Sequence, residues 1–316
     1  MKVGRRLLGA CVSLASWSEG VQLGLGSRRA LLRSGIAGVS LGWRSGMAAA
    51  AGGGAGATVT VQVDGQPQTF PAQPLLPPGF EKAFELRIRN ITDEVFEADK
   101  QFPEAYPYSR ADMRRLDETD DGGFYSEPRF VYHVDAGAVA ALTHYYGETI
   151  PPGSDILDIC SSWVSHYPRS FPTTMRSITG TGMNALELQA NSQLTSFDPL
   201  DLNRTPRLPY PDESFDCVTC VVSVDYLNNP LDVFREVRRV LRPGGRFILS
   251  QSNRLFYTKA VAIWLGLDDF GRLELIGDYF HYAGGFTSPQ AFDISAKGRG
   301  ARDPMYIVQA IKEGKA

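Results

Sequence analysis

The chain has 316 residues and a formal net charge of −3 at pH 7, with only four cysteines. The first 57 residues hold seven Lys and Arg against one Glu, a charge of +6, so residues 58–316 carry −9. An acidic body without a basic stripe argues against nucleic acid as the main partner, and four cysteines are too few for a disulfide scaffold. No stretch beyond residue 57 is as long and apolar as a membrane span, so no transmembrane segment is predicted.

Residues 1–57 have the composition of an organellar targeting leader, because they are basic, rich in Ser and end in an Ala/Gly linker. We therefore predict a chloroplast protein and exclude this segment from the fold. Within it, SRRALLRSGIAGVSLG places two arginines before a short apolar run, as a second signal for the thylakoid lumen would. Arg44 interrupts the end of the run, which favours the stroma and leaves the lumen open.

Residues 58–80 are predicted to form a hairpin-like segment and a proline-rich connector. TVTVQVDGQPQTF alternates around Asp64-Gly65, a dipeptide typical of tight hairpin turns, and PAQPLLPPGF follows it. Residues 81–150 are predicted as a helical lead-in, with one or two helices in 81–117 and another from about Asp135 to Tyr146.

Residues 151–316 alternate between predicted strands and helices. The expected strands are Asp155–Ile159, Arg176–Thr181, Gln193–Asp198, Phe215–Val224, Arg246–Ser250 and 305–312, and the expected helices are Ala185–Asn191, Pro230–Leu241 and Leu273–Tyr282, with a loosely placed helix after the first strand. This rhythm predicts an α/β fold with a doubly wound, mostly parallel sheet. Ligands bind such sheets beyond the carboxyl ends of the strands. Cys217 and Cys220 form a CxxC within a predicted strand, where they point to opposite faces, so we interpret them as core cysteines.

The segment LPYPDESFDCVTCVVSVDYLNNPLDVFREVRRVLRPGGRFILS, residues 208–250, carries the strongest signal. It resembles the second half of the class I S-adenosylmethionine-dependent methyltransferase core, in the branch that methylates small molecules and quinone-like substrates. The resemblance covers about 154–312. FYSEPRFVYHVD also resembles a lead-in of a plant and algal subgroup whose members carry Cys-Ser-Ser-Trp. The resemblance implies a Rossmann-like core, S-adenosyl-L-methionine as cofactor and a small or lipophilic acceptor.

The loop after the first core strand departs from the family pattern. Asp158 matches the acid that ends this strand, but Cys160, Ser162 and Val164 stand where the family has glycines. Glycine serves there because the backbone must approach the ligand closely. Cys160, Ser161 and Ser162 are small enough to present backbone amides to a cofactor, and either serine could cap a following helix.

A second departure follows the next strand, where Gly182 stands in place of the acid that binds the ribose. The resemblance implies that Met183 contacts adenine and that Asn184 meets the ribose, with Glu187 as a distant substitute for the acid. A plain turn with Asn184 near a helix N-cap is the open alternative. Asp201 and Leu202, after the third strand, match the family's contacts with the adenine edge. For Asp158 and Asp201, ordinary loop roles stay open.

The acceptor would lie beyond the fourth and fifth strands, near SVDYL and SQSNRLFY. Methyl transfer from a sulfonium mainly requires positioning of the nucleophile and sometimes removal of its proton. We predict Asp225 and His281 as candidate catalytic bases, each with a structural alternative. The predicted acceptor contacts are Tyr226, Asn253, Arg254 and Tyr279. His133, His144 and His166 show no metal-ligand spacing, so no metal is predicted.

Two functions of different class follow from these residues. The first is a plastid methyltransferase that acts on a small or lipophilic acceptor. The second is a non-catalytic, methyltransferase-like binding or assembly module, favoured by the missing glycines and the missing ribose acid. The sequence names neither the acceptor nor the oligomeric state.

Overall fold

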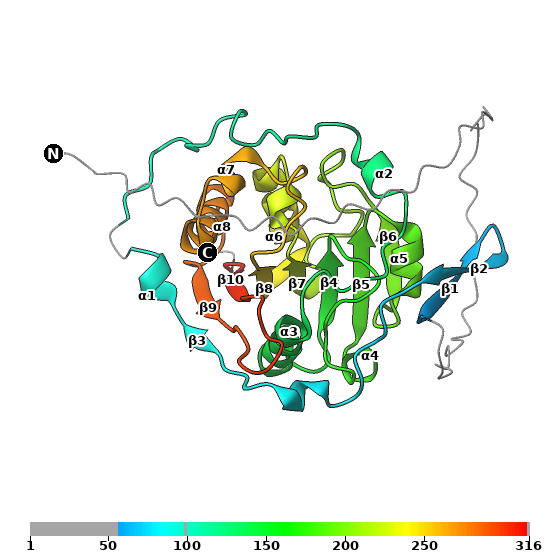
Figure 1. The fold of residues 1–316 in the computed structure, drawn as a ribbon. Coiled ribbons are helices and arrows are strands. Elements are labelled where there is room, and N and C mark those ends of the chain that lie inside the picture. The colour runs from blue at the N-terminus through cyan, green and yellow to red at the C-terminus, as the bar shows by residue number, and fades with distance from the viewer. Residues whose placement is uncertain (1–55, 98–99, 315–316) are drawn as a thin grey trace. The chain divides into compact units, whose positions relative to one another are not determined.

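A computed structural model describes residues 56–97 and 100–314, so the predicted leader lies, up to residue 55, outside the described residues. The described part contains an eight-stranded sheet with the order β3-β9-β10-β8-β7-β4-β5-β6 (Figure 1). Its parallel strands are β4 (Asp155–Ile159), β5 (Ser177–Gly182), β6 (Ser196–Pro199), β7 (Phe215–Val221) and β8 (Leu241–Gln251).

Two strands run antiparallel to the others, one inside the sheet and one at its edge. β10 (Tyr306–Ile311) runs antiparallel to β8 on one side and to β9 (Gln290–Asp293) on the other, and the short β3 (Arg89–Asn90) completes the edge. The mostly parallel sheet with flanking helices matches the Rossmann-like methyltransferase fold predicted from the sequence. The sequence pattern did not reveal β9.

Helices cover both faces of the sheet and bury two apolar clusters. α6 (Pro230–Val240) and α8 (Asp269–Ala283) contribute to one cluster, and α3 (Ala136–Thr149) contributes to the other. α6 has proline at its first position and an apolar stripe that is fully buried, which is why it forms and packs where it does. Cys220 belongs to the first cluster and Cys217 to the second, as expected for residues on opposite faces of β7.

The hairpin predicted around Asp64-Gly65 is present. β1 (Thr58–Val63) pairs antiparallel with β2 (Gln66–Pro71), and both turn residues have positive φ, 51° and 76°. These values suit a two-residue turn whose twist matches that of the flanking strands.

The helices predicted over 81–117 are mostly absent. The described residues of this range, which leave out 98 and 99, hold one 3-10 turn, η1 (Phe80–Ala83), and one helical turn, α1 (Thr92–Val95). Instead of forming a helix, the segment after Lys100 packs along α8 through individual side chains. Lys100 Nζ lies 2.6 Å from Asp278 Oδ1, and the Tyr108 hydroxyl donates to the other oxygen of the same carboxylate. Tertiary contacts therefore override the local helical tendency of this segment.

The helix placed only loosely after β4 amounts to a single helical turn. Residues 160–170 run as an irregular loop, and the first helical element is the single turn α4 (Phe171–Thr174). Cys160 and His166 in this loop have φ of 54° and 60°, outside the right-handed helical region. The expectation that Ser161 or Ser162 caps a helix was therefore wrong, because there is no helix N-terminus at this point of the chain.

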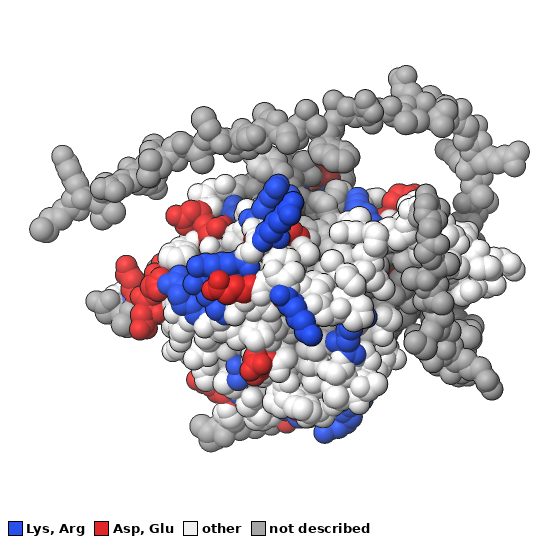
Figure 2. Space-filling model, turned by 60° about the horizontal axis from the view of Figure 1, so that its bottom comes forward, with Lys and Arg blue, Asp and Glu red and all other residues white. Residues whose placement is uncertain are grey.

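The face opposite the carboxyl ends of the parallel strands shows basic and acidic side chains interspersed among neutral ones (Figure 2). Among helices in the described ranges, none combines the length and apolar character needed to cross a bilayer. Within these same ranges, no group of three or more His, Cys, Asp or Glu is arranged to hold a metal ion.

Candidate functional site

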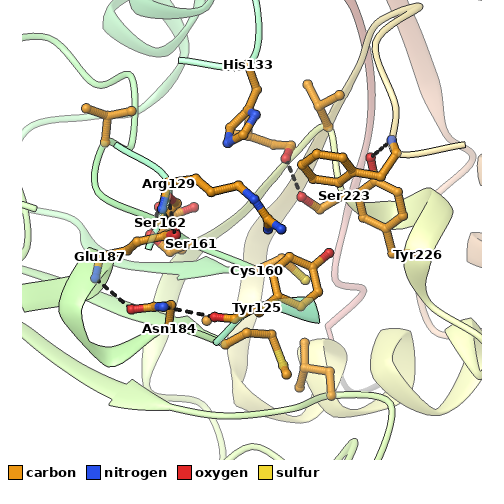
Figure 3. A pocket seen from close by; sticks show the side chains of 18 of the residues that line it. Tyr125, Arg129, His133, Cys160, Ser161, Ser162, Asn184, Glu187, Ser223 and Tyr226 are labelled. Carbon is orange, nitrogen blue, oxygen red and sulfur yellow. Dashed lines mark hydrogen bonds between the residues drawn. The ribbon is translucent and has the colours of Figure 1, made fainter. Parts of the chain in front are cut away.

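A cavity of about 340 Å³ lies beyond the carboxyl ends of the parallel strands (Figure 3). Its floor comes from the residues that follow β4, β5, β6 and β7. Its cover comes from residues 121–134 of the lead-in and from the loop after β8. The predicted cofactor residues all line it: Asp158, Cys160, Ser161, Ser162, Gly182, Met183, Asn184, Asp201 and Leu202.

The loop after β4 is held by its serine hydroxyls. Ser161 Oγ donates to Asp158 Oδ2 at 2.6 Å, and the Thr219 hydroxyl donates to Asp158 Oδ1 at 3.0 Å. The Ser161 amide donates to Thr181 O at 2.6 Å, which ties the loop to β5. Burial raises the pKa of Asp158 to about 6, and the hydrogen bonds to its carboxylate oppose part of that rise. Asp158 thus organises the loop from beneath the cavity.

Glu187 links this loop to the cover. Its Oε2 accepts from Ser162 Oγ at 2.6 Å, and its Oε1 accepts from the backbone N–H of Arg129 at 2.7 Å. Burial raises the pKa of Glu187, and the same two hydrogen bonds oppose this rise. Ser162, Glu187 and Arg129 therefore form one chain of contacts along the wall of the cavity.

Asn184 serves as the N-cap of α5 (Ala185–Ala190), the structural alternative that the sequence left open. Its Oδ1 accepts from the amides of Leu186 and Glu187, and its Nδ2 donates to the carbonyls of Tyr125 and Ser126. The amide group thus caps the helix and anchors the cover at the same time. Its contact with a ribose stays a prediction.

Asp201 shapes the turn after β6. Its Oδ1 accepts from the backbone amides of Asn203 and Arg204, at 2.9 and 3.3 Å. Asn203 in turn donates to Asp121 Oδ2 and to Tyr226 O, both at 3.0 Å. This turn therefore joins the predicted adenine side of the cavity to both the cover and the loop after β7.

The cover supplies cavity residues that sequence reasoning did not single out. Tyr125, Arg129 and His133 all line the cavity. Arg129 lies over the rings of Phe124 and Phe256, with its guanidinium carbon 4.5 and 5.5 Å from the two centroids. The sequence feature that could have pointed to these residues is FYSEPRFVYHVD, because its polar and aromatic side chains are of the kind that line ligand sites.

Two histidines face the cavity in strained backbone conformations. His133 and His166 have φ of 63° and 60°, in the left-handed region. Burial lowers the pKa of both, that of His166 to about 4, so both imidazoles are neutral at pH 7. His166 is 8% exposed, and its Nδ1 has no hydrogen-bond partner among the residues described. Strain of this kind gathers at binding and catalytic sites.

The predicted acceptor side is formed by the ends of β7 and β8. Tyr226 lines the cavity, and its hydroxyl accepts from the backbone N–H of Phe256 at 2.8 Å. Arg254 also lines it, while its Nε pairs with Asp303 Oδ1 at 2.8 Å. Val222 has φ of 44°, a rare conformation for a β-branched residue. Ser223, the next residue, lines the cavity beside Tyr226.

Four of the predicted residues are not brought to the cavity. Asp225 is 2% exposed and does not line the cavity, and neither of its carboxylate oxygens has a hydrogen-bond partner in the described part of the chain. Tyr279 is buried with its hydroxyl near Met113 Sδ, 3.9 Å away. Asn253 and His281 are exposed, and the His281 ring stacks on Phe102 with centroids 3.6 Å apart. The geometry thus separates these four from the other predicted site residues.

A buried charge cluster fastens the cover. The Lys259 side chain is fully buried, and its Nζ lies 3.0 Å from Asp117 Oδ2 and 3.1 Å from Asp121 Oδ1. Asp121 also pairs with Arg115 at 2.7 Å. Because Asp121 lines the cavity, this cluster sets the position of α2 (Asp121–Phe124) above the site.

The methyltransferase domain family matches residues 165–249. The match covers β5 to most of β8, including the segment with the sequence signal, and begins just after the glycine-free part of the loop. A malonyl-[acyl-carrier protein] O-methyltransferase of Marinomonas sp. is 35% identical over 63 residues, 20% of this chain and 23% of that protein. A demethylmenaquinone methyltransferase of Chlamydia trachomatis is 30% identical over 121 residues, 36% of this chain and 49% of that protein.

The chain thus spans less than half the length of these curated relatives. Among solved structures, the [4+2]-cyclase SpnF aligns with 56% of this chain and 82% of its own, at 17% identity and a TM-score of 0.43. The YcgJ protein from Bacillus subtilis aligns with 55% of this chain and 99% of its own, at 15% identity and a TM-score of 0.41.

Proposed function

We propose that this protein is an S-adenosylmethionine-dependent methyltransferase that acts on a small-molecule acceptor. The observation that carries the proposal is the gathering of the predicted cofactor residues around one cavity, at the carboxyl ends of four parallel strands. The family match over residues 165–249 supports the same reaction class. On the composition of its leader, we propose the chloroplast as the site of this activity.

The cavity suits such a cofactor in size and in several of its groups. A volume of about 340 Å³ lies in the range of small-ligand sites. Met183 offers an apolar side chain for an adenine ring, and Asp201 keeps Oδ2 available as an acceptor for its amine, because the turn uses only Oδ1. Bound there, the cofactor would supply an electrophilic methyl group.

The protein's own contribution would be to position the acceptor and exclude water. Ser223, Tyr226 and Phe256 form the part of the cavity wall that follows β7 and β8, and the His133 ring of the cover packs edge-on against Phe256, with centroids 5.5 Å apart (Figure 3). Because burial lowers the pKa of His133, its imidazole is neutral near pH 7 and able to accept a proton. Asp225, the base predicted from the sequence, lies outside this arrangement, so we propose His133 for that role.

Calorimetric titration of the full chain with S-adenosylhomocysteine tests the proposal. We expect saturable binding with one ligand per chain. Asp201→Asn keeps an acceptor for the turn but removes the charge, so it should weaken binding by about 1–2 kcal/mol, the difference between charge-assisted and neutral hydrogen bonds. Asp64→Asn, in the exposed hairpin turn, is the matched control. If the parent chain shows no saturable binding up to millimolar ligand, the non-catalytic module is the better account.

A further inference from the structure

Arg129 presents a cation to the cavity, and the carboxylate that acts on it electrostatically, that of Glu187, already accepts hydrogen bonds from the Arg129 backbone and from Ser162. Its Nη2 donates to Phe124 O at 2.9 Å, and its guanidinium is otherwise held against the faces of Phe124 and Phe256. No ion pair between Arg129 and an Asp or Glu is formed within residues 56–97 and 100–314. Arginine has five N–H donors in a planar fork, so most of this donor capacity is available to a ligand.

The loop beneath Arg129 lacks the usual means of binding an anion. A helix that follows the first strand of such a sheet points its N-terminal amides at the ligand, but residues 160–170 form no helix. The Ser161 amide already donates to Thr181 O, and the hydroxyls of Ser161 and Ser162 donate to Asp158 and Glu187. An anionic group at this end of the cavity therefore needs another partner.

Arg129 is fixed in position to be that partner. Its backbone N–H donates to Glu187, which also holds Ser162, so the cover and the loop are tied together where the arginine begins. Figure 3 shows the side chain extending from beside Ser162 into the cavity, with its guanidinium between His133 and Tyr125. The Phe124 and Phe256 rings pack edge to face beside the guanidinium, with centroids 5.2 Å apart, and so restrict its orientation and lower the cost of ordering it on binding.

We propose that Arg129 binds the carboxylate of the cofactor's amino-acid part, in place of the helix N-terminus that this chain lacks. The inference rests on the proposed function and assigns a residue of the cover to cofactor recognition. It also explains how a loop without glycine is compatible with the cofactor. The loop then only has to leave room for the cofactor. The positive charge that complements the carboxylate comes from Arg129, 31 residues before Cys160 in the sequence.

The test compares two ligands on the full chain by calorimetric titration. S-adenosylhomocysteine carries the carboxylate, and 5′-methylthioadenosine keeps the adenosine and sulfur but lacks the amino-acid part. Arg129→Gln should lower the affinity for S-adenosylhomocysteine roughly 10- to 100-fold, the loss expected for a charge-assisted hydrogen bond. Its affinity for 5′-methylthioadenosine should stay within about twofold of the parent. Arg235→Gln, at an exposed arginine of α6 that pairs with Asp232 away from the cavity, is the matched control and should change neither affinity.

The outcomes separate the inference from the function on which it rests. Decarboxylated S-adenosylhomocysteine should bind the parent roughly 10- to 100-fold more weakly than S-adenosylhomocysteine does, a comparison that needs no variant. If Arg129→Gln binds S-adenosylhomocysteine as tightly as the parent does, the inference is overturned while the proposed function stands. Arg129 would then be a candidate to bind an anionic acceptor. Equal losses for both ligands also overturn it, since they indicate collapse of the cover. A parent chain that binds neither ligand overturns the proposed function together with the inference.

Discussion

Gly182, at the end of β5, lies so close to Ser161 that a Cβ atom on this glycine would come within 2.0 Å of the Ser161 carbonyl oxygen. The glycine-free loop after β4 and the missing acid at position 182 are therefore structurally linked. The loop after β4 occupies the space that a side chain at position 182 would need. An acid at this position, as the family has for the ribose, is incompatible with the observed loop.

This contact predicts that Gly182→Ala destabilises the protein by about 1–3 kcal/mol, the usual cost of forcing extra atoms into a packed site. Gly123→Ala is the matched control, because a Cβ on Gly123 would meet nothing within 4 Å. Urea unfolding of both variants measures the difference. Equal stability of the two variants would show that the loop moves aside at little cost.

Cys160 has the backbone conformation that glycine adopts most easily, with φ of 54°. We expect Cys160→Gly to be more stable than Cys160→Ala by about 1 kcal/mol, because only the alanine retains the left-handed strain. Both variants lose the same thiol, so the comparison isolates the backbone. Thermal unfolding of the pair measures it, and an alanine variant as stable as the glycine variant would contradict strain at this position.

Asp225 predicts a pH dependence of stability. Burial raises its pKa in the folded state to about 8, with Arg272 opposing the shift, whereas an unfolded Asp has a pKa of about 4. The folded state therefore binds the proton more tightly. The stability gained from the tighter proton binding by Asp225 is fully present below pH 4 and is lost as the pH rises from about 4 to about 8.

Asp225→Asn resembles the protonated carboxyl at every pH and removes this dependence. The stability of the variant relative to the parent should rise by a few kcal/mol, at about 1.4 kcal/mol per unit of pKa, between pH 4 and pH 8. Asp64→Asn, in an exposed turn, should show a constant difference from its parent. Chemical denaturation across this pH range measures both differences, and a constant difference in stability between Asp225→Asn and the parent would rule out a strongly raised pKa of Asp225.

Substitution of Lys259 tests how much the buried charge cluster stabilises the cover. Lys259→Met leaves Asp117 without its buried partner and Asp121 paired with Arg115 alone, and it should cost about 3–5 kcal/mol of unfolding free energy. Lys297→Met removes an exposed lysine and should change stability by less than about 0.5 kcal/mol. Denaturant unfolding compares the two variants. A small loss for Lys259→Met would mean that the cluster contributes little to holding the cover.

Local sequence determined the hairpin and most of the sheet. Asp64-Gly65 fixes the hairpin because its backbone preference is set by two residues. The segment 208–250 determined β7, α6 and β8, because each buries its apolar residues at its own regular spacing. The placement of Cys217 and Cys220 on opposite faces followed from the same strand periodicity.

The tertiary structure alone decided how the cavity is covered and which polar groups face it. Glu187 meets Arg129 across 58 residues, and Asn203 meets Asp121 across 82, and neither pairing leaves a periodic signal in the sequence. Residues 160–170 run as a loop whose serines bond to Asp158, at the end of β4, and to Glu187, in α5. His281 sits in a helix that was correctly anticipated, whereas Asp225 lies in a 3-10 turn, η2 (Val224–Tyr226), that was not, and both residues lie outside the cavity. Spacing along the chain fixes which face a residue occupies, while the packing of distant segments decides whether that face meets ligand, core or solvent.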